Sequence, residues 1–120
     1  MNSNVKKYGL WALKTLAALA FLGAGFAKLT SAEMMVATFE GVGIGQWFRY
    51  VTGTIEIVGA IALFVPGKAA YGAVALALVM VGAIFSHLVV IGGNPTPAIV
   101  LLVLTSTIAW SQKDQIKLIA

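Results

Sequence analysis

Residues 69–91 read AAYGAVALALVMVGAIFSHLVVI, an apolar stretch without any Asp, Glu, Lys or Arg. A helix needs about 20 such residues to cross the hydrocarbon core of a bilayer, so this stretch predicts a transmembrane helix. The whole chain has the same character, because 60% of its 120 residues are hydrophobic, 10% are charged, and its mean hydropathy is +0.96. About 25% of an average soluble domain is charged. We therefore expect one small domain built of membrane spans.

Three further apolar stretches predict the other spans, at residues 8–28, 48–65 and 96–112. The last of these is short for a full crossing, and we expect it either to continue into residues 112–118 or to lie tilted in a thinned part of the bilayer. Pro97 is well placed to open this helix. The expected fold class is all-α, an integral membrane four-helix bundle that forms a single transmembrane domain over residues 1–120.

A shorter helix is predicted between the first two spans. The segment Thr30-Ser31-Ala32-Glu33 has the pattern of a capping box, in which Thr30 caps a helix whose third residue is Glu33. Apolar residues follow until Gly41. We expect this helix to lie at the membrane surface, either as a lid over one end of the bundle or as an interfacial helix without a gating role.

The distribution of charge predicts the orientation of the spans. The side that holds both termini carries Lys6, Lys7, Lys68, Lys113 and Lys117. On the other side, Lys28 and Arg49 are offset by Glu33 and Glu40. Cytoplasmic loops are rich in Lys and Arg, so both termini are expected in the cytoplasm and the protein in the inner membrane. The formal net charge of +4 is scattered between apolar segments, which argues against a nucleic-acid partner.

Four polar residues are expected at a similar depth in the outer half of the bundle: Lys28, Arg49, Glu56 and His87. Glu56 lies about 10.5 Å deeper than Arg49 on the same helix face, at 1.5 Å per residue. A charge in the middle of a span costs roughly 2.5–3.5 kcal/mol on insertion scales, so Glu56 needs a partner. We expect Lys28 to pair with Glu56, and His87 to hydrogen-bond the carboxylate or face a ligand. The cluster either locks helix packing or forms a functional site.

Two other features concern packing and the inner end of the first span. Ala69, Ala73 and Ala77 form a stripe of small residues that allows close approach of a second helix, from the same chain or from a second copy in a homo-oligomer. Lys14 lies within two turns of the cytoplasmic end of its span. We expect it to extend to the interface and to be inert.

Several kinds of chemistry are excluded by the residues present. The chain has no cysteine, which removes disulfides, thiolate metal sites and cysteine nucleophiles. One histidine with one glutamate is a poor metal site, so no metal is expected. A nucleophile–base pair and a phosphate-binding loop are also missing, which argues against catalysis by this chain alone.

The polar residues and their surroundings resemble the DoxX-like family of small four-helix bacterial membrane proteins. The resemblance covers roughly residues 10–110 and lies in FLGAGFAKL (21–29), FEGVG (39–43), RYVTGTIEIVGA (49–60) and GAIFSH (82–87). It implies a four-helix integral membrane fold. It also implies that the family's recurring polar positions correspond to Lys28, Arg49, Glu56 and His87.

The resemblance implies a function less directly than a fold. Some relatives are linked to sulfur-compound oxidation with quinone, and others to membrane complexes that respond to oxidative stress. We therefore expect a membrane subunit of a quinone-linked redox system, with quinone as the candidate cofactor and a membrane or soluble redox protein as partner. Two alternatives stay open: a non-catalytic scaffold that anchors a partner, and a small proton-coupled transporter in which Glu56 exchanges a proton for a cationic substrate.

Overall fold

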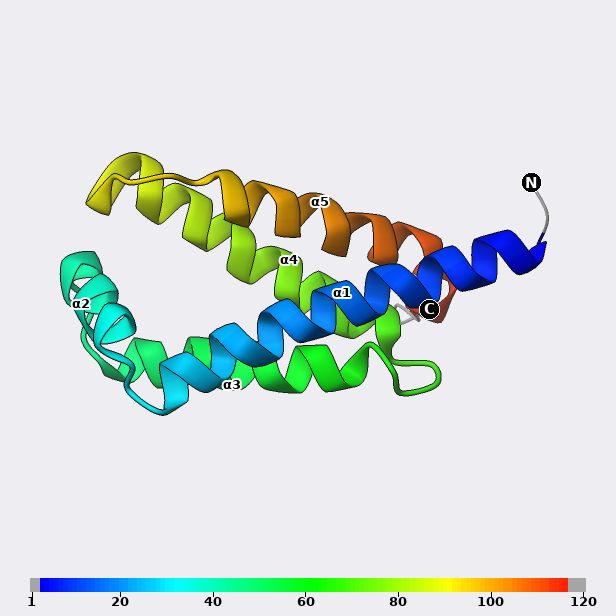
Figure 1. Ribbon diagram of the computed structural model, residues 1–120, viewed down its shortest axis with the longest axis horizontal. Coiled ribbons are helices and arrows are strands. Elements are labelled where there is room, and N and C mark those ends of the chain that lie inside the picture. Colours follow the sequence, from blue (N-terminus) through cyan, green and yellow to red (C-terminus); the bar gives the residue numbers. More distant parts are fainter. Residues whose placement is uncertain (1–2, 117–120) are drawn as a thin grey trace.

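The computed structural model describes residues 3–116, so the predicted topology determinant Lys117 and residue 118 lie outside the described part (Figure 1). The chain is all-α in this range, as predicted. Its five α-helices are α1 (Ser3–Leu29), α2 (Glu33–Val42), α3 (Trp47–Ala62), α4 (Ala69–Phe85) and α5 (Thr96–Ser111). A π-helical segment, η1 (Ser86–Ile91), continues α4, and a 3-10 turn, η2 (Lys113–Gln115), follows α5.

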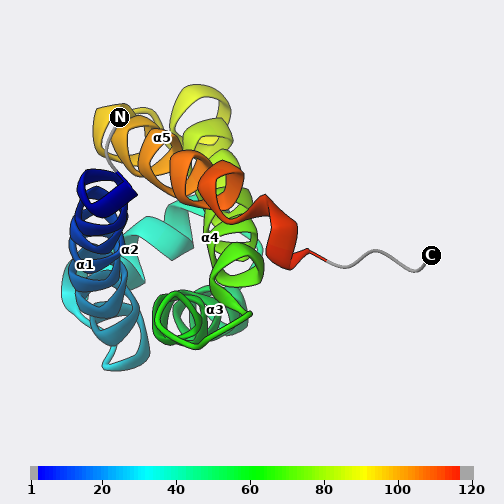
Figure 2. The ribbon, with the colours of Figure 1, turned by 90° about the vertical axis from the view of Figure 1, so that its right-hand side faces the viewer.

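The four longer helices pack in a ring in the order α1, α3, α4, α5, with α5 returning to contact α1 (Figure 2). The short helix α2 crosses one end of this ring and contacts α1, α3 and η1. We call this the α2 end. The start of α1, the α3–α4 connection and the end of α5 lie together at the opposite end, which we call the terminal end (Figure 1).

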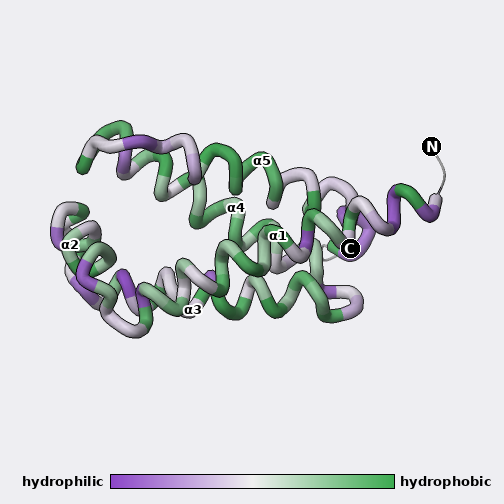
Figure 3. The backbone as a smooth tube through the Cα atoms, in the orientation of Figure 1, coloured by the Kyte–Doolittle hydropathy of each residue, from purple (hydrophilic) through white to green (hydrophobic). Residues whose placement is uncertain are grey.

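Within the described residues, two helices are long and apolar enough to cross a membrane: Ser3–Leu29 and Ala69–Ile91. The other two members of the ring, α3 and α5, have 16 residues each. Apolar residues occupy the middle of the helices, whereas the hydrophilic segments gather near the two ends (Figure 3). After α5 ends at Ser111, the 3-10 turn begins, so the helix does not continue into residues 112–116.

The core of the ring is built from small and medium apolar side chains. Phe21, Leu63, Leu76 and Ile108 are fully buried, and alanines fill the space between them. The stripe of small residues on α4 takes part in this core, because Ala69 and Ala73 are buried and Ala77 is half-buried. The stripe therefore serves packing within the chain.

Two pairs of glycines let α3 approach its neighbours closely. A Cβ atom added to Gly25 of α1 would lie 2.9 Å from the carbonyl oxygen of Gly53 on α3. A Cβ atom added to Gly72 of α4 would lie 2.7 Å from the carbonyl oxygen of Gly59, also on α3. Real Cβ atoms are not found at such distances from backbone, so both helix crossings depend on these glycines.

The short helix predicted between the first two spans is present, but its predicted cap is wrong. Helix α1 continues to Leu29, and the hydroxyl of Thr30 donates to the carbonyl oxygen of Phe26, one turn back, at 2.7 Å. Thr30 therefore does not cap α2, which begins at Glu33 without a side-chain cap. It ends at Val42, where Gly43 takes the left-handed conformation typical of a helix C-terminus.

Candidate functional site

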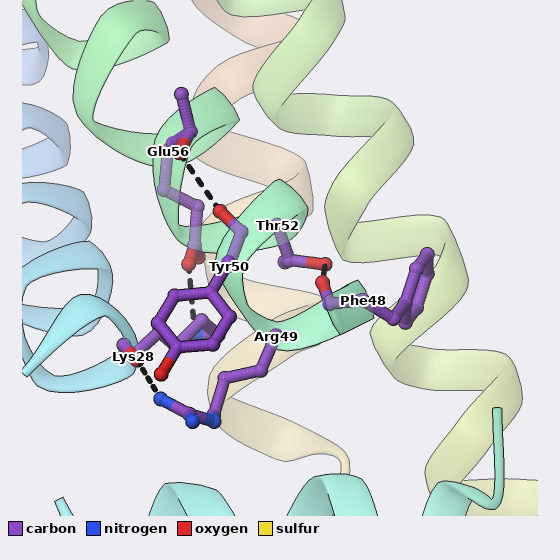
Figure 4. Close-up of polar contacts among 7 residues, drawn as sticks. Lys28, Phe48, Arg49, Tyr50, Thr52 and Glu56 are labelled. Atoms are coloured by element: carbon purple, nitrogen blue, oxygen red, sulfur yellow. Dashed lines mark hydrogen bonds and ion pairs between the residues drawn. The ribbon is translucent and has the colours of Figure 1, made fainter. Parts of the chain in front are cut away.

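The predicted pairing of Lys28 with Glu56 is confirmed. The ammonium nitrogen of Lys28 lies 2.7 Å from Oε1 of Glu56, and both side chains are buried (Figure 4). The same carboxylate oxygen has no hydrogen bond of good geometry within the described residues. At this distance the attraction between the two opposite charges holds the pair together.

The helix crossing at Gly25 and Gly53 explains how the two charges meet. Lys28 and Glu56 each follow their glycine by three residues, or about 4.5 Å of helix axis. Since α1 and α3 are antiparallel, the two residues start on opposite sides of the crossing (Figure 1). Side chains on a helix tilt towards its N-terminus, so both side chains point back to the crossing and towards each other.

Arg49, at the start of α3, holds the end of α1 in place. Its Nε donates to Oε1 of Gln46 at 2.7 Å, and its Nη1 donates to Oγ of Ser31 at 3.0 Å and to the carbonyl oxygen of Lys28. The guanidinium carbon lies 4.3 Å from the centre of the Tyr50 ring. Arg49 is only 3% exposed, and no carboxylate pairs with it in residues 3–116. A cation at a helix C-terminus is favourable, so Arg49 caps α1.

His87 is not part of this group of contacts. It lies in η1, where its Nδ1 is 2.8 Å from the carbonyl oxygen of Gly92, and the hydrogen bond expected between His87 and Glu56 is not found among the described residues. A carbonyl oxygen can only accept, so Nδ1 carries a proton and donates it to this oxygen. That His87 faces a ligand stays a prediction.

Three residues that support Arg49 were not predicted from the sequence: Ser31, Gln46 and Tyr50. Ser31 has a φ of +60°, and its hydroxyl lies 3.4 Å from the Tyr50 hydroxyl. Gln46 Nε2 donates to the carbonyl oxygen of Val36 at 3.0 Å, which ties α2 to the start of α3. The spacing of Gln46 and Arg49, one helical turn apart, was the available signal for their contact.

An open hollow of about 490 Å³ lies between α2 and η1, at the same end of the molecule as the ion pair. Its lining residues are Met34, Ala37, Thr38, Gly41, Val90 and Ile91. The lining is mostly apolar, as in many sites for small organic ligands. The hydroxyl of Thr38 is already bonded to the carbonyl oxygen of Met34.

Lys14 does not extend into the surroundings as predicted. It is 8% exposed, and its Nζ lies 3.5 Å from Oε1 of Gln112, at the end of α5. The prediction was wrong because Gln112, which directly follows α5, supplies a polar partner for Lys14.

The polar side chains of Lys28, Arg49 and Glu56 are hydrogen-bond donors and one carboxylate, and they do not form a metal site. Within residues 3–116, no three His, Asp or Glu side chains gather where they could hold a metal ion. Lys28 and Arg49 carry N–H donors, and Glu56 carries a carboxylate that can exchange a proton. These are the groups with which this end of the helix ring can donate hydrogen bonds and exchange a proton.

Comparison with known proteins identifies one family. The model of the DoxX-like family matches residues 12–110 of the chain, a range that holds Lys28, Arg49, Glu56 and His87. No curated protein matches the chain, and no solved structure matches it. The family assignment therefore rests on a match over most of the chain length.

Proposed function

Because the chain belongs to the DoxX-like family, we propose that it is a multi-pass inner-membrane protein and the membrane subunit of a quinone-linked redox system. In this proposal residues 1–120 form one transmembrane domain. The spans are α1, α3, α4 with η1, and α5. Helix α2 lies at the outer surface of the membrane, and both termini face the cytoplasm.

The apolar outside of the helix ring supports a membrane location. Each long helix exposes large apolar side chains that point away from the core, and one example from each is more than half exposed: Leu19, Val58, Leu78 and Val103. On a soluble protein, large apolar side chains exposed on every long helix would favour association or aggregation. In a bilayer the same surface contacts lipid chains.

The charges at the two ends support the orientation. Exposed charged residues at the terminal end are Lys6, Lys7, Lys68, Lys113 and Asp114. The exposed charged residues described at the α2 end are Glu33 and Glu40. An excess of Lys and Arg marks the cytoplasmic side of membrane proteins, so the terminal end is placed there.

The buried ion pair of Lys28 and Glu56, beside buried Arg49, is the observation that carries the functional proposal. Replacing a buried ion pair by apolar residues is often neutral or stabilising, so such pairs are weak devices for stability. Ionisable residues within membrane spans are most often functional. A quinone offers two carbonyl oxygens as acceptors, which suit the N–H donors of Lys28 and Arg49, and Glu56 would exchange protons with the ligand.

The chain itself supplies binding and proton exchange in this proposal, and a partner supplies the electrons. It has no cysteine, and the histidine in η1 is its only one. A membrane or soluble redox protein is therefore the required partner. The apolar hollow between α2 and η1 supports an approach of the quinone at the α2 end.

A non-catalytic scaffold is the second candidate, and one observation favours it. The donors of Arg49 are directed to Gln46, Ser31 and the backbone of Lys28, while Lys28 neutralises Glu56. A cluster whose donors and charges are paired within the protein in this way can hold α1, α2 and α3 together without binding a ligand. The protein would then act by anchoring its partner.

Binding of a short-chain quinone to the purified protein in lipid nanodiscs separates the two candidates. We expect saturable binding by wild type, a loss of at least tenfold in affinity in Glu56→Gln, and unchanged binding in Glu40→Gln, an exposed glutamate of α2. Equal binding by all three proteins would contradict a quinone site at Glu56. Absence of binding with a folded wild-type protein would favour the scaffold.

A further inference from the structure

The terminal end contains a buried lysine that the proposed quinone site does not use. Among residues 3–116, the Lys14 side chain has one hydrogen bond, the 3.5 Å contact to Gln112, whereas an ammonium group has three N–H donors. No carboxylate lies within ion-pair distance of Lys14 among residues 3–116. A buried cation without a counter-charge is unfavourable, so an anionic group is what this site lacks.

A glutamine network fixes the surroundings of Lys14. Oε1 of Gln112, which contacts Lys14, also accepts a hydrogen bond from Nε2 of Gln115 at 3.0 Å. Oε1 of Gln115 in turn accepts from the backbone N–H of Ala70 at 3.0 Å. The network links α1, η2 and the first turn of α4. The oxygen of Gln112 has two lone pairs and accepts from both donors, but it satisfies only one of the three N–H donors of Lys14.

Aromatic rings hold lysines at the same end of the molecule. The ammonium groups lie 5.2, 5.7 and 3.8 Å from ring centres in the pairs Lys14–Trp11, Lys68–Tyr71 and Lys113–Trp110. All three rings are exposed. Exposed Trp and Tyr side chains near the ends of spans sit at the depth of the lipid headgroups, so these pairs keep the cations at that depth.

The three lysines are linked by the same short segment of chain. Lys113 follows Gln112, the hydrogen-bond partner of Lys14. Lys68 lines an open hollow of about 450 Å³ together with Pro66, Gly67, Tyr71, Asp114 and Gln115. Asp114 is the only acidic residue described at this end, so the local charge stays positive.

We propose that the terminal end binds the phosphate group of an anionic phospholipid, at the junction of α1 with the segment after α5. Lys14 supplies the free N–H donors, and Lys113 and Lys68 supply further positive charge at headgroup depth. Binding of one headgroup would hold Gln112, at the end of α5, against α1 and complete the charge balance of Lys14. The inference relies on the proposed inner-membrane orientation and is independent of the quinone.

Titration of phosphatidylglycerol into delipidated protein, followed by native mass spectrometry, tests this site. A lysine near an anionic surface contributes about 1 kcal/mol, so Lys14→Gln should weaken binding about fivefold. Lys14→Arg keeps the charge and should retain binding. The matched control is Lys7→Gln, which removes an exposed lysine of the same helix that has no ring partner in the described part of the chain. Phosphatidylcholine should bind more weakly than phosphatidylglycerol.

The outcomes that overturn the proposal are defined by the same series. If Lys7→Gln loses as much affinity for phosphatidylglycerol as Lys14→Gln, the lipid is attracted by net charge and not by a defined site. Unchanged binding in Lys14→Gln would exclude the site. Displacement of the lipid by an equal concentration of inorganic phosphate would exclude a lipid as the occupant. Should Lys14→Gln fail to fold, Lys113→Gln, which changes an exposed residue of η2, is expected to show the same selective loss.

Discussion

Gly25 of α1 and Gly53 of α3 meet so closely that a Cβ atom on either would press against the other helix, 2.9 Å or 3.1 Å from the carbonyl oxygen of its partner. The ion pair of Lys28 and Glu56 straddles this crossing. Each charged side chain tilts back towards the glycines, and the absence of side chains there brings the two helices close enough for contact. The glycines thus determine whether the charges can pair.

Substitution of a crossing glycine should therefore destabilise the fold. Overpacking typically costs 1–3 kcal/mol, so we expect Gly53→Ala to lower the free energy of unfolding by about that amount. Denaturant unfolding in detergent measures it. The control is Gly23→Ala, because a Cβ atom there meets nothing within 4 Å. An interior Gly→Ala change favours a helix by about 1 kcal/mol, so the control should be neutral or stabilising. Equal losses in both variants would contradict the close crossing.

Neutralising one member of the ion pair should lower the free energy of unfolding more than neutralising both. Lys28→Met leaves Glu56 buried without its partner, and breaking a buried pair in this way typically costs 3–5 kcal/mol. The double variant Lys28→Met/Glu56→Gln should recover a large part of that loss. A double-mutant cycle of unfolding free energies measures the coupling. Strictly additive losses would show that the two charges do not stabilise each other.

Arg49→Lys should loosen the end of α1 although it keeps the positive charge. Lysine lacks the planar fork of donors with which Arg49 reaches Gln46, Ser31 and the backbone of Lys28. We expect faster amide hydrogen exchange in residues 29–33, with residues 70–80 of α4 as the internal reference. Unchanged exchange in residues 29–33 would mean that Arg49 does not cap α1.

The orientation in the membrane can be read by labelling, since the chain has no native cysteine. Glu40→Cys places a thiol at the α2 end and Lys113→Cys places one at the terminal end. In intact spheroplasts a membrane-impermeant maleimide should label Glu40→Cys, and should label Lys113→Cys only after lysis. The reverse pattern would invert the topology, and labelling of both without lysis would refute the inner-membrane placement.

The sequence was sufficient to predict the ion pair, because a carboxyl in an apolar run needs a partner and the order of spans brings only a few cations near it. Glu56 and Lys28 are found together for that reason. Gly53, between Arg49 and Glu56 on one helix face, also indicates that a neighbouring helix can approach there. That it meets Gly25 of α1 could not be predicted, because the register of two helices is a property of the packed ring.

Local details were less predictable than the polar pair. Thr30 has the right spacing to cap α2, but its hydroxyl instead donates to the carbonyl oxygen of Phe26 in α1. Residues 86–91 contain no Gly or Pro from which the change to a π-helix could be predicted. The π-helix places His87 beside Gly92. The polar partner of Lys14 is Gln112, which lies 98 residues further along the chain, so no local pattern could predict the contact.

The central claim, a quinone held at Lys28, Arg49 and Glu56, is tested most directly by mass spectrometry of an organic extract from protein purified in mild detergent. We predict a quinone in near-stoichiometric amount in wild type, strongly reduced in Glu56→Gln and retained in Glu40→Gln. A wild-type protein that is folded and carries no quinone, or a quinone content that is equal in all three proteins, would contradict the claim.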